Sequence, residues 1–288
     1  MSATHPDFFS AQVTRARRFY LDLQPAEGAR AVVVSGGCEH CEPDYAIHRR
    51  SFRYLSIEYV NSGRGQLILG GHTYALQPGT LFSYGPRIAQ DIRTDPDDRL
   101  VKYFVDFVGR APRALLAVAQ LTPGSVMQTS DPAEVTALFE NLIRNGERES
   151  PYRERICAAV LEQLLLKLAE TVMPPGSANS TAFRTYHRCR QYIEDHFMEL
   201  TSLGQIAQAC HINAPYLCRL FQRFDHQRPY QLLVRLQMVR AAERLQQPGA
   251  LVKQVAAEMG SSDPYHFSRV FKRVHGLPPS EFIRLRGD

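Results

Sequence analysis

The segment from Asp263 to Gly276, DPYHFSRVFKRVHG, brings three aromatic residues, two histidines, two arginines and a lysine together within fourteen residues. Three structures would account for this composition: a buried core helix, a cluster that binds a metal or cofactor, or a surface that contacts a partner. A second segment about fifty residues upstream, APYLCRLFQRF (Ala214–Phe224), repeats the pattern. The comparison of the two copies separates these alternatives.

The repeat extends upstream of both segments, since QIAQACHINAPYLCRLFQRF aligns with QVAAEMGSSDPYHFSRVFKRV. Each copy is typical of a short helix, a tight turn and a longer helix. Apolar residues in both longer helices recur with the spacing i, i+3, i+4 and i+7, which marks one helix face. We therefore predict core positions at Leu217, Leu220, Phe221 and Phe224 in the first copy, and at Phe267, Val270, Phe271 and Val274 in the second.

The opposite face of each longer helix is polar and basic. It carries Pro215, Cys218, Arg219 and Gln222 in the first copy and Tyr265, Ser268, Arg269 and Lys272 in the second, with Asn213 and Asp263 as candidate N-caps. A short exposed helix with arginine and small polar side chains, preceded by a packed partner helix, fits the major groove of DNA. A helix-turn-helix with a purely structural role is the alternative.

Charge is distributed unevenly along the chain. Residues 183–288 hold 15 Lys and Arg against 9 Asp and Glu, whereas the first 182 residues hold 19 against 20. The excess positive charge therefore lies in the last third, which favours a nucleic acid or another polyanion as its partner. Solvated helix faces would also account for this excess.

The C-terminal residues resemble the AraC/XylS family of bacterial transcription regulators over about 100 residues. The match to the second helix-turn-helix of that family rests on Ala256, Gly260, Asp263, Phe267, Ser268, Arg269, Phe271, Lys272, Gly276, Pro279 and Phe282. The first helix-turn-helix matches through Ala207, Leu217, Arg219, Leu220 and Phe221, and the connecting helix through Arg235, Leu236, Ala241 and Leu245. The chain departs from the family pattern at Ser261, where Phe is usual, at His266, where Tyr is usual, and at Cys218, where Ser is usual.

The resemblance implies a DNA-binding domain at 183–288, with helix-turn-helix motifs at about 202–224 and 251–274. Its two recognition helices would enter successive major grooves about 34 Å apart. By the same resemblance, residue by residue, the residues that would contact the bases are Pro215, Cys218, Arg219, Gln222, Tyr265, Ser268 and Arg269. Contact with the DNA backbone falls to Arg223, Lys272 and Arg273.

The first two thirds of the chain have a different texture. Short β-branched and aromatic runs, separated by Gly, Pro and Asn turn signals, predict strands from about 30 to 108. Two helical segments follow, with Val135, Leu138, Phe139 and Leu142 on one face of the first. PPGSANSTA is typical of a linker. We predict an α+β, two-domain protein: a cupin-like β-barrel with a helical hairpin at 1–173, a linker at 174–182 and the all-α domain.

This region also resembles the cupin-type effector-binding domain common in the same family, which implies a small-molecule pocket, often for a sugar, and a dimerising helix surface. Polar and aromatic residues on predicted inward-facing strands are the pocket candidates: Tyr54, Glu58, Tyr84, Arg87 and Gln90. A catalytic cupin would need clustered histidine ligands. Residues 88–90 read Ile-Ala-Gln where such a histidine is expected, and His40, His48 and His72 form no H-x-H pair.

CEHCEPDYAIH offers a second candidate for metal chemistry. A C-x-x-C pair (Cys38 and Cys41) with His40 and His48 nearby can bind zinc or sense redox state. Adjacent His40 and Cys41 splay apart on most backbones, so we expect a loop before a strand and no metal or cofactor. We expect most of the cysteines (these two with Cys157, Cys189, Cys210 and Cys218) to be small buried hydrophobes.

These observations predict a sequence-specific DNA-binding transcription regulator, a ligand-responsive activator of carbohydrate-related genes rather than an enzyme. The alternatives are a ligand-independent or metal- or redox-responsive regulator, and a cupin enzyme fused to a DNA-binding tail. The expected partners are double-stranded DNA, a small effector, a second copy of the chain and RNA polymerase. The opening residues show no basic-then-apolar leader and no apolar run could span a bilayer, so we expect a cytoplasmic bacterial protein.

Overall fold

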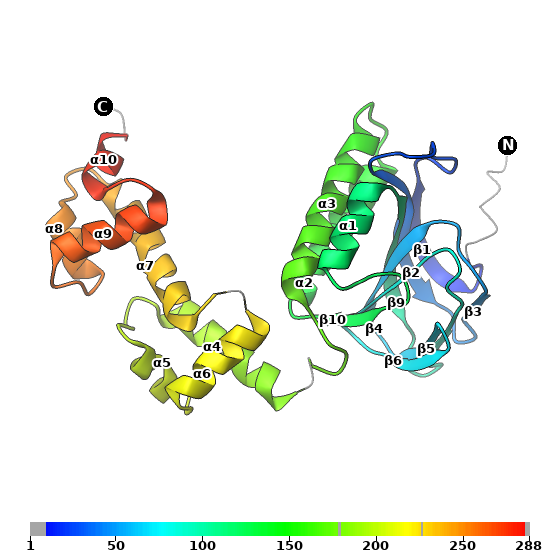
Figure 1. The fold of residues 1–288 in the computed structure, drawn as a ribbon, viewed down its shortest axis with the longest axis horizontal. Helices are drawn as coiled ribbons and strands as arrows, with labels where there is room; N and C mark the ends of the chain where they lie inside the picture. Colours follow the sequence, from blue (N-terminus) through cyan, green and yellow to red (C-terminus); the bar gives the residue numbers. More distant parts are fainter. Residues whose placement is uncertain (1–9, 178–179, 226, 286–288) are drawn as a thin grey trace. The chain divides into compact units, whose positions relative to one another are not determined.

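The computed structural model of the chain describes residues 10–177, 180–225 and 227–285. The chain forms two compact units, Met1–Ala178 and Asn179–Asp288 (Figure 1). The division falls within the predicted linker, whose residues 178 and 179 lie outside the described residues. The start of the chain, on which the expectation of no leader rests, also lies outside them. Within the described residues, no helix is long and apolar enough to cross a membrane.

The first unit contains two antiparallel sheets. The larger sheet has the strand order β1-β2-β9-β4-β7-β10-β11 and the smaller one β3-β8-β5-β6. The strands are β1 (Val13–Tyr20), β2 (Val32–Cys41), β3 (Ala46–Arg49), β4 (Leu55–Ser62), β5 (Gly65–Leu69), β6 (His72–Leu76), β7 (Thr80–Tyr84), β8 (Gln90–Thr94), β9 (Val101–Val108), β10 (Val126–Thr129) and β11 (Val172–Met173). The prediction of a sheet-rich first domain is confirmed.

The alternation of side chains along β9 places its residues in two different cores, one on each face of the larger sheet. Successive side chains of a strand point to opposite faces, and in VKYFVDFV the residues Tyr103, Val105 and Phe107 belong to the core beneath the helices. Lys102, Phe104 and Asp106 point to the other face, where a second core includes Leu67 and other residues of the smaller sheet. The polar residues of β9 are therefore buried between the two sheets.

Helices cover the outer face of the larger sheet (Figure 1): α1 (Arg110–Val118), α2 (Pro132–Glu147) and α3 (Arg153–Thr171). α2 has Pro132 in its first turn, and the Asp131 side chain accepts a hydrogen bond from the Glu134 backbone N–H. The predicted apolar face of α2 is fully buried against α3 and the sheet. At Gly146 an added Cβ would lie 2.3 Å from the Phe19 ring, so a larger residue here would push β1 away from α2.

The second unit is helical. Its elements are α4 (Thr181–His196), α5 (Leu203–Ala209), α6 (Ala214–Phe224), α7 (Pro229–Leu245), α8 (Val252–Glu258), α9 (Pro264–His275) and α10 (Pro279–Arg284). α7 packs against α4 and α6 and also against α8, α9 and α10, so it joins two lobes (Figure 1). α5–α6 and α8–α9 are the two helix-turn-helix units that the repeat predicts.

The two copies share their turn and cap chemistry. His211 and Gly260 occupy the left-handed region at equivalent points of the turns, with φ of 54° and 72°. Asn213 Oδ1 accepts from the Tyr216 N–H at 2.8 Å, and Asp263 Oδ1 accepts from the Tyr265 N–H at 2.8 Å. Both predicted N-caps are confirmed. They orient the longer helices α6 and α9 by satisfying backbone donors in the first turn.

The core of α9 departs from the prediction in its last turn. All four predicted core residues of α6 are buried, and so are Phe267 and Phe271 of α9. Val270 is partly buried, and the prediction for Val274 is wrong because its side chain is 37% exposed. His275 packs inward instead, with its ring 4.4 Å from that of Phe271 and its Nε2 2.9 Å from the Met238 carbonyl oxygen. Gly276 then ends the helix, so no further turn covers Val274.

Candidate functional site

The polar face of α6 is open to solvent. Pro215, Arg219, Gln222 and Arg223 are exposed, and Cys218 is half-buried. The Arg219 guanidinium lies 5.7 Å from the ring centroid of Tyr216, and that of Arg223 lies 5.0 Å from the ring of Phe224. Contact with a ring keeps each arginine near the helix surface without neutralising its charge.

The equivalent face of α9 is also exposed. Tyr265 is 83% exposed, and Arg269, Lys272 and Arg273 are exposed as well. Ser268 is half-buried, and its hydroxyl donates to the Pro264 carbonyl oxygen at 2.8 Å. The Ser268 hydroxyl proton is therefore engaged within the helix, which leaves the oxygen as an acceptor.

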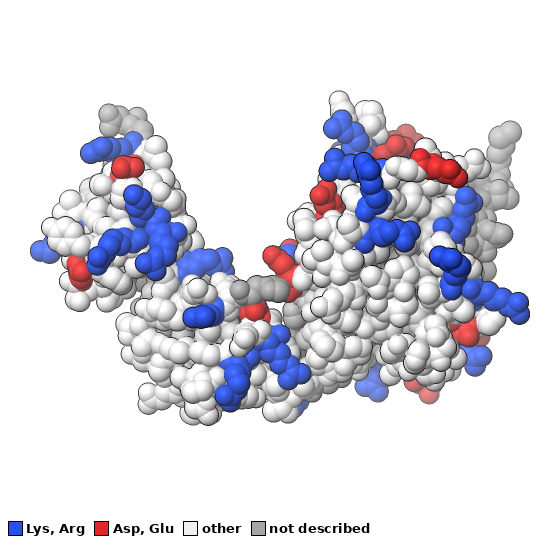
Figure 2. Space-filling model, in the orientation of Figure 1, with Lys and Arg blue, Asp and Glu red and all other residues white. Residues whose placement is uncertain are grey.

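The basic residues on these two faces are not engaged by acids. Within the described part of this unit, the arginines in ion pairs are Arg190, Arg240 and Arg244. Arg219, Arg223, Arg269, Lys272 and Arg273 form no ion pair with a described residue. Figure 2 shows Lys and Arg spread over the helical unit, with few acidic residues among them. Unpaired cations on exposed helices are what phosphate neutralisation requires.

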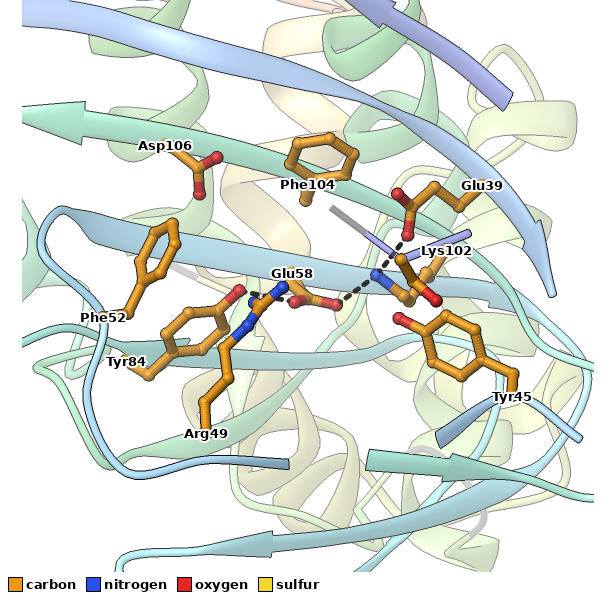
Figure 3. Close-up of a pocket in the computed structure, with 10 residues that line it drawn as sticks. Glu39, Tyr45, Arg49, Phe52, Glu58, Tyr84, Lys102, Phe104 and Asp106 are labelled. Atoms are coloured by element: carbon orange, nitrogen blue, oxygen red, sulfur yellow. Dashed lines mark hydrogen bonds and ion pairs between the residues drawn. The ribbon is translucent and has the colours of Figure 1, made fainter. Parts of the chain in front are cut away.

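The first unit contains a different kind of site, a buried polar cavity between its two sheets (Figure 3). The lining residues are Ser10, Glu39, Tyr45, Arg49, Phe52, Glu58, Tyr84, Lys102, Phe104 and Asp106. Strand register brings them together: Glu39 pairs with Lys102, and Asp106 pairs with both Ser35 and Ser56. The cavity volume is about 20 Å³, which is room for about one water molecule.

Lys102 is the centre of this polar cluster. Its Nζ lies 2.8 Å from Glu39 Oε2 and 2.9 Å from Glu58 Oε2, and its side chain is only 4% exposed. Tyr45 and Phe104 contribute aromatic faces 5.5 and 5.6 Å from the ammonium. Burial would lower the pKa of Lys102, but the two carboxylates hold its pKa well above the usual value. Lys102 is therefore a permanently charged bridge across β2, β9 and β4.

Both glutamates have partners at each carboxylate oxygen. Arg18 donates to Glu39 Oε1 through Nε at 2.9 Å, and the Tyr84 hydroxyl donates to Glu58 Oε1 at 2.6 Å. Burial would raise the pKa of Glu39, but Lys102 and Arg18 hold it below the usual value. The contacts of both carboxylates hold them in place, which makes these glutamates structural supports of the cavity wall.

Asp106 has fewer partners. Its Oδ2 accepts from the Ser35 hydroxyl at 2.7 Å, and its side chain is almost completely buried. Burial raises the pKa of Asp106 to about 7, against the opposing effects of Ser35 and Ser56. Arg49 reaches over the cavity from β3, with its guanidinium 5.3 Å from the Phe52 ring. Asp106 is thus an acid whose charge state changes near neutral pH.

The structure brings two of the five predicted pocket residues into the cavity wall, Glu58 and Tyr84. Tyr54 is buried beside them, but its hydroxyl donates to the Leu23 carbonyl oxygen. Arg87 lies at the surface in the turn after β7, and Gln90 is buried at the start of β8 without lining the cavity. The prediction missed Glu39, Tyr45, Arg49, Lys102 and Asp106. Three of them, Glu39, Lys102 and Asp106, are charged residues inside strands that are otherwise largely apolar, and this feature could have identified them from the sequence.

The CEHCEPDYAIH cluster does not converge. The prediction of a loop before a strand is wrong for its first four residues, because Cys38–Cys41 form the end of β2 and pair with β1 and β9. Cys38 belongs to the core under the helices and Cys41 to the core between the sheets, so their side chains point to opposite faces of β2. His48 lies on β3 and pairs with Asp91. Over residues 10–177, 180–225 and 227–285, no group of three or more His, Cys, Asp or Glu side chains could hold a metal ion. Cys157, Cys189 and Cys210 are buried, as expected, and Cys218 is half-buried.

Family comparisons match both units. The AraC-like ligand binding domain family matches residues 34–165, which include all the lining residues of the cavity except Ser10. A helix-turn-helix domain family matches residues 206–285, which include α6 and α9. Together the two matches cover more than half of the chain.

Several bacterial regulators are similar to this chain. The arabinose operon regulatory protein of Salmonella typhimurium is 28% identical over 238 residues, 76% of this chain and 80% of that protein. The raffinose operon transcriptional regulatory protein RafR of Pediococcus pentosaceus is 21% identical over 264 residues, 88% of this chain and 94% of that protein. An uncharacterized HTH-type transcriptional regulator of Bacillus subtilis, YisR, is 28% identical over 149 residues, about half of each chain.

The duplicated helix-turn-helix with its open basic faces, the sheet-rich domain with a polar cavity and the two family matches agree with one another. The chain belongs to the AraC family of DNA-binding transcription regulators.

Proposed function

We propose that this regulator responds to a small carbohydrate-like effector bound in the cavity of the first unit, and that the effector changes how the second unit binds DNA. The observation that carries the proposal is the cavity itself, with buried paired charges and aromatic walls, in a chain that also carries two DNA-reading helices. Pockets for small polar ligands combine apolar walls with a few convergent polar groups in this way.

Two observations favour a carbohydrate over other ligands. Tyr45, Phe52, Tyr84 and Phe104 supply aromatic surface beside carboxylates and a guanidinium, which together suit the apolar and hydroxyl faces of a sugar. Two of the similar proteins are named for arabinose and raffinose operons. A sugar is much larger than the present cavity, so its binding requires lining side chains such as Arg49 and Phe52 to move.

For the DNA-binding unit, we infer that base reading is carried out by Pro215, Cys218, Arg219, Gln222, Tyr265, Ser268 and Arg269. Arg223, Lys272 and Arg273 contact the backbone. The exposure of both helix faces and their unpaired cations support this division. α7 links the two lobes, so the two helices reach the duplex as one unit.

The outer face of α3 supports a dimer. Ile156, Ala159, Gln163 and Leu166 are exposed at the alternating spacing of three and four that helix pairs use, and Ile156 and Leu166 are 38% and 51% exposed. We infer that a second copy of the chain covers this face. Ile156→Asp with Leu166→Asp should then yield a monomer in sedimentation velocity, whereas an unchanged sedimentation coefficient contradicts the inference.

Two further features complete the proposal. We infer that the protein activates transcription through contact with RNA polymerase, in the bacterial cytoplasm, and that it has no enzymatic activity. The ion pairs that occupy Glu39 and Glu58 support a binding role, because carboxylates neutralised in this way are poor general bases.

A thermal-shift screen of the full chain with mono- and oligosaccharides tests the proposal. We expect a subset to raise the melting temperature and to change the affinity for DNA. A ligand-independent regulator, the second candidate, would bind DNA with no stabilising sugar. A metal- or redox-responsive regulator would instead lose its response in a Cys38→Ser, Cys41→Ser double variant. The opposite orientation of these two thiols argues against a metal- or redox-responsive role.

A further inference from the structure

Three carboxylates line the cavity, and their partners differ. Glu39 and Glu58 each have one oxygen at Lys102 and the other at Arg18 or Tyr84. Asp106 accepts from Ser35 at Oδ2. Its Oδ1 forms no hydrogen bond with a described residue, although the hydroxyl of its neighbour Ser56 on β4 lies close enough to lower the pKa of Asp106. Glu58 Oε2 also lacks a hydrogen bond but lies 2.9 Å from the Lys102 ammonium, so among the lining carboxylates the oxygen with neither a hydrogen bond nor an ion pair is Asp106 Oδ1.

The position of Asp106 makes this open acceptor available to a ligand. The residue is 2% exposed and lies on the cavity side of β9, as do Lys102 and Phe104 (Figure 3). A buried acceptor without a donor destabilises a protein, and such groups in native structures are usually satisfied by a water molecule or a ligand. The cavity beside Asp106 has room for about one water molecule, which a hydroxyl group can replace.

The charges around the cavity indicate which ligand fits. Three cations (Arg18, Arg49 and Lys102) face three acids (Glu39, Glu58 and Asp106), so the formal charges cancel when all are ionised. A ligand with its own charge would introduce an uncompensated charge into a buried site, which is unfavourable. A neutral ligand with hydroxyl donors avoids this penalty and satisfies Asp106.

We propose that Asp106 is the residue that recognises the effector: its Oδ1 accepts a hydrogen bond from a hydroxyl of a neutral polyol or sugar, and formation of this bond releases a proton from the site. The inference rests on the proposed effector cavity. It adds that the ligand is uncharged, which residue selects it and how its affinity depends on pH.

The direction of the pH dependence follows from the surroundings of Asp106. The titratable or charged groups that face it are Arg49 from β3, Tyr54 before β4, Glu58 from β4 and Tyr84 from β7. Burial raises the pKa of Asp106 to about 7. A donated hydroxyl hydrogen bond stabilises the ionised form, so the bound effector lowers this pKa. Affinity should therefore rise with pH and level off above about 8.

The first experiment uses the full wild-type chain and no variant. The probes are three panels, namely neutral monosaccharides and polyols, amino sugars, and uronic acids, each screened by thermal shift at pH 5.5, 7 and 8. The neutral probe with the largest shift is then titrated calorimetrically. We expect stabilisation by neutral probes only, with an affinity about 30-fold weaker at pH 5.5 than at pH 8 if one proton is released.

Two matched variants separate Asp106 from the rest of the unit. Asp106→Asn removes the titrating group while keeping an acceptor for Ser35, so the affinity should become independent of pH. Glu140→Gln is the control, since Glu140 lies on α2, where it accepts from Tyr103 and pairs with Arg17, a contact beneath the helices. This control should retain the wild-type pH dependence.

Each outcome decides a separate point. A neutral sugar that binds the wild type equally at every pH, or an Asp106→Asn variant with the same pH dependence, overturns the role of Asp106 and leaves the effector cavity standing. Binding of charged probes alone overturns the ligand class. If no probe binds at any pH, then the proposed carbohydrate response fails together with this inference.

Discussion

The two units of this protein use charge in opposite ways. In the first unit Lys102, Glu39 and Glu58 are buried and paired at 2.8 and 2.9 Å. In the second unit Arg219, Arg269 and their neighbours are exposed and form no ion pair with a described residue. The net charge of the chain includes both sets of residues without distinction. Their burial and pairing nevertheless give them different binding properties.

The difference shows why net charge identifies a partner for one unit and not for the other. Exposed unpaired cations attract phosphate over a long range and with little desolvation. Buried paired charges have no long-range field, but they hold polar groups rigidly around a small space. The first arrangement suits a large polyanion, and the second suits a small ligand.

We expect the largest effect from a substitution that disrupts the buried ion pairs of Lys102 with Glu39 and Glu58. Lys102→Met leaves Glu58 buried without a cation and Glu39 with Arg18 alone, so it should lower the free energy of unfolding of the first unit by about 3–5 kcal/mol. Urea unfolding followed by near-ultraviolet circular dichroism measures the loss. The matched control is Lys167→Met on α3, whose partner Glu170 is 61% exposed. The control should lose less than about 1 kcal/mol, and equal losses in the two variants would contradict the contrast.

The next effect concerns Asp106 and the stability of the protein as a function of pH. The unfolded aspartate ionises near 3.8, whereas burial holds the folded pKa at about 7. The folded state therefore binds the proton more tightly, and the wild type loses stability as pH rises from about 4 to 7. Asp106→Asn should remove this loss, which is on the order of 4 kcal/mol at about 1.4 kcal/mol per pKa unit. Unfolding measured at pH 4, 5.5, 7 and 8 checks it, and parallel profiles for the two proteins would refute it.

The exposed charges should give smaller effects, and these effects should fall on DNA binding alone. Arg219→Ala or Arg269→Ala should weaken binding to a selected operator by roughly 1–3 kcal/mol and relax specificity at one base pair. Binding to a library of single-base operator variants measures both quantities. Equal loss on all sequences would make the residue a phosphate contact.

The smallest effect distinguishes backbone contacts from base contacts. Lys272→Gln or Arg273→Gln should weaken binding to all sequences alike, and each should reduce the salt dependence of the affinity by about one unit of slope. Arg240→Gln on α7 is the control, because Arg240 is already paired with Glu243 at 2.8 Å. A control that changes the slope as much as the test variants would count against the assignment.

The helical unit was predictable because its signals are local. The repeat and the periodicity of α6 place Leu217, Leu220, Phe221 and Phe224 correctly in the core. The error at Val274 has a physical origin. The neighbouring residue His275 packs into the core at the end of the helix instead, because its ring contacts Phe271 and its Nε2 lies near the Met238 carbonyl oxygen. Apolar periodicity cannot anticipate a polar residue that packs through its ring.

The cavity was only partly predictable because pairing between distant strands creates it. Glu58 and Tyr84 belong to the neighbouring strands β4 and β7, whose β-branched and aromatic residues are local signals of strands. Lys102 and Glu39 meet through the pairing of β2 with β9, which are separated by about sixty residues in sequence. Strand order does not follow from composition, so the pairing of Lys102 with two acids could not be predicted before the register of β2, β9 and β4 was known.

The central claim is that a neutral ligand in the cavity controls DNA binding by the second unit. It is tested most directly by titrating the full chain onto an operator selected from random sequence, at pH 8, with and without a saturating neutral sugar from the thermal-shift screen. We predict a change in affinity within the 5- to 150-fold range typical of coupled sites, or a changed footprint. The same affinity and the same footprint with and without the sugar would contradict it.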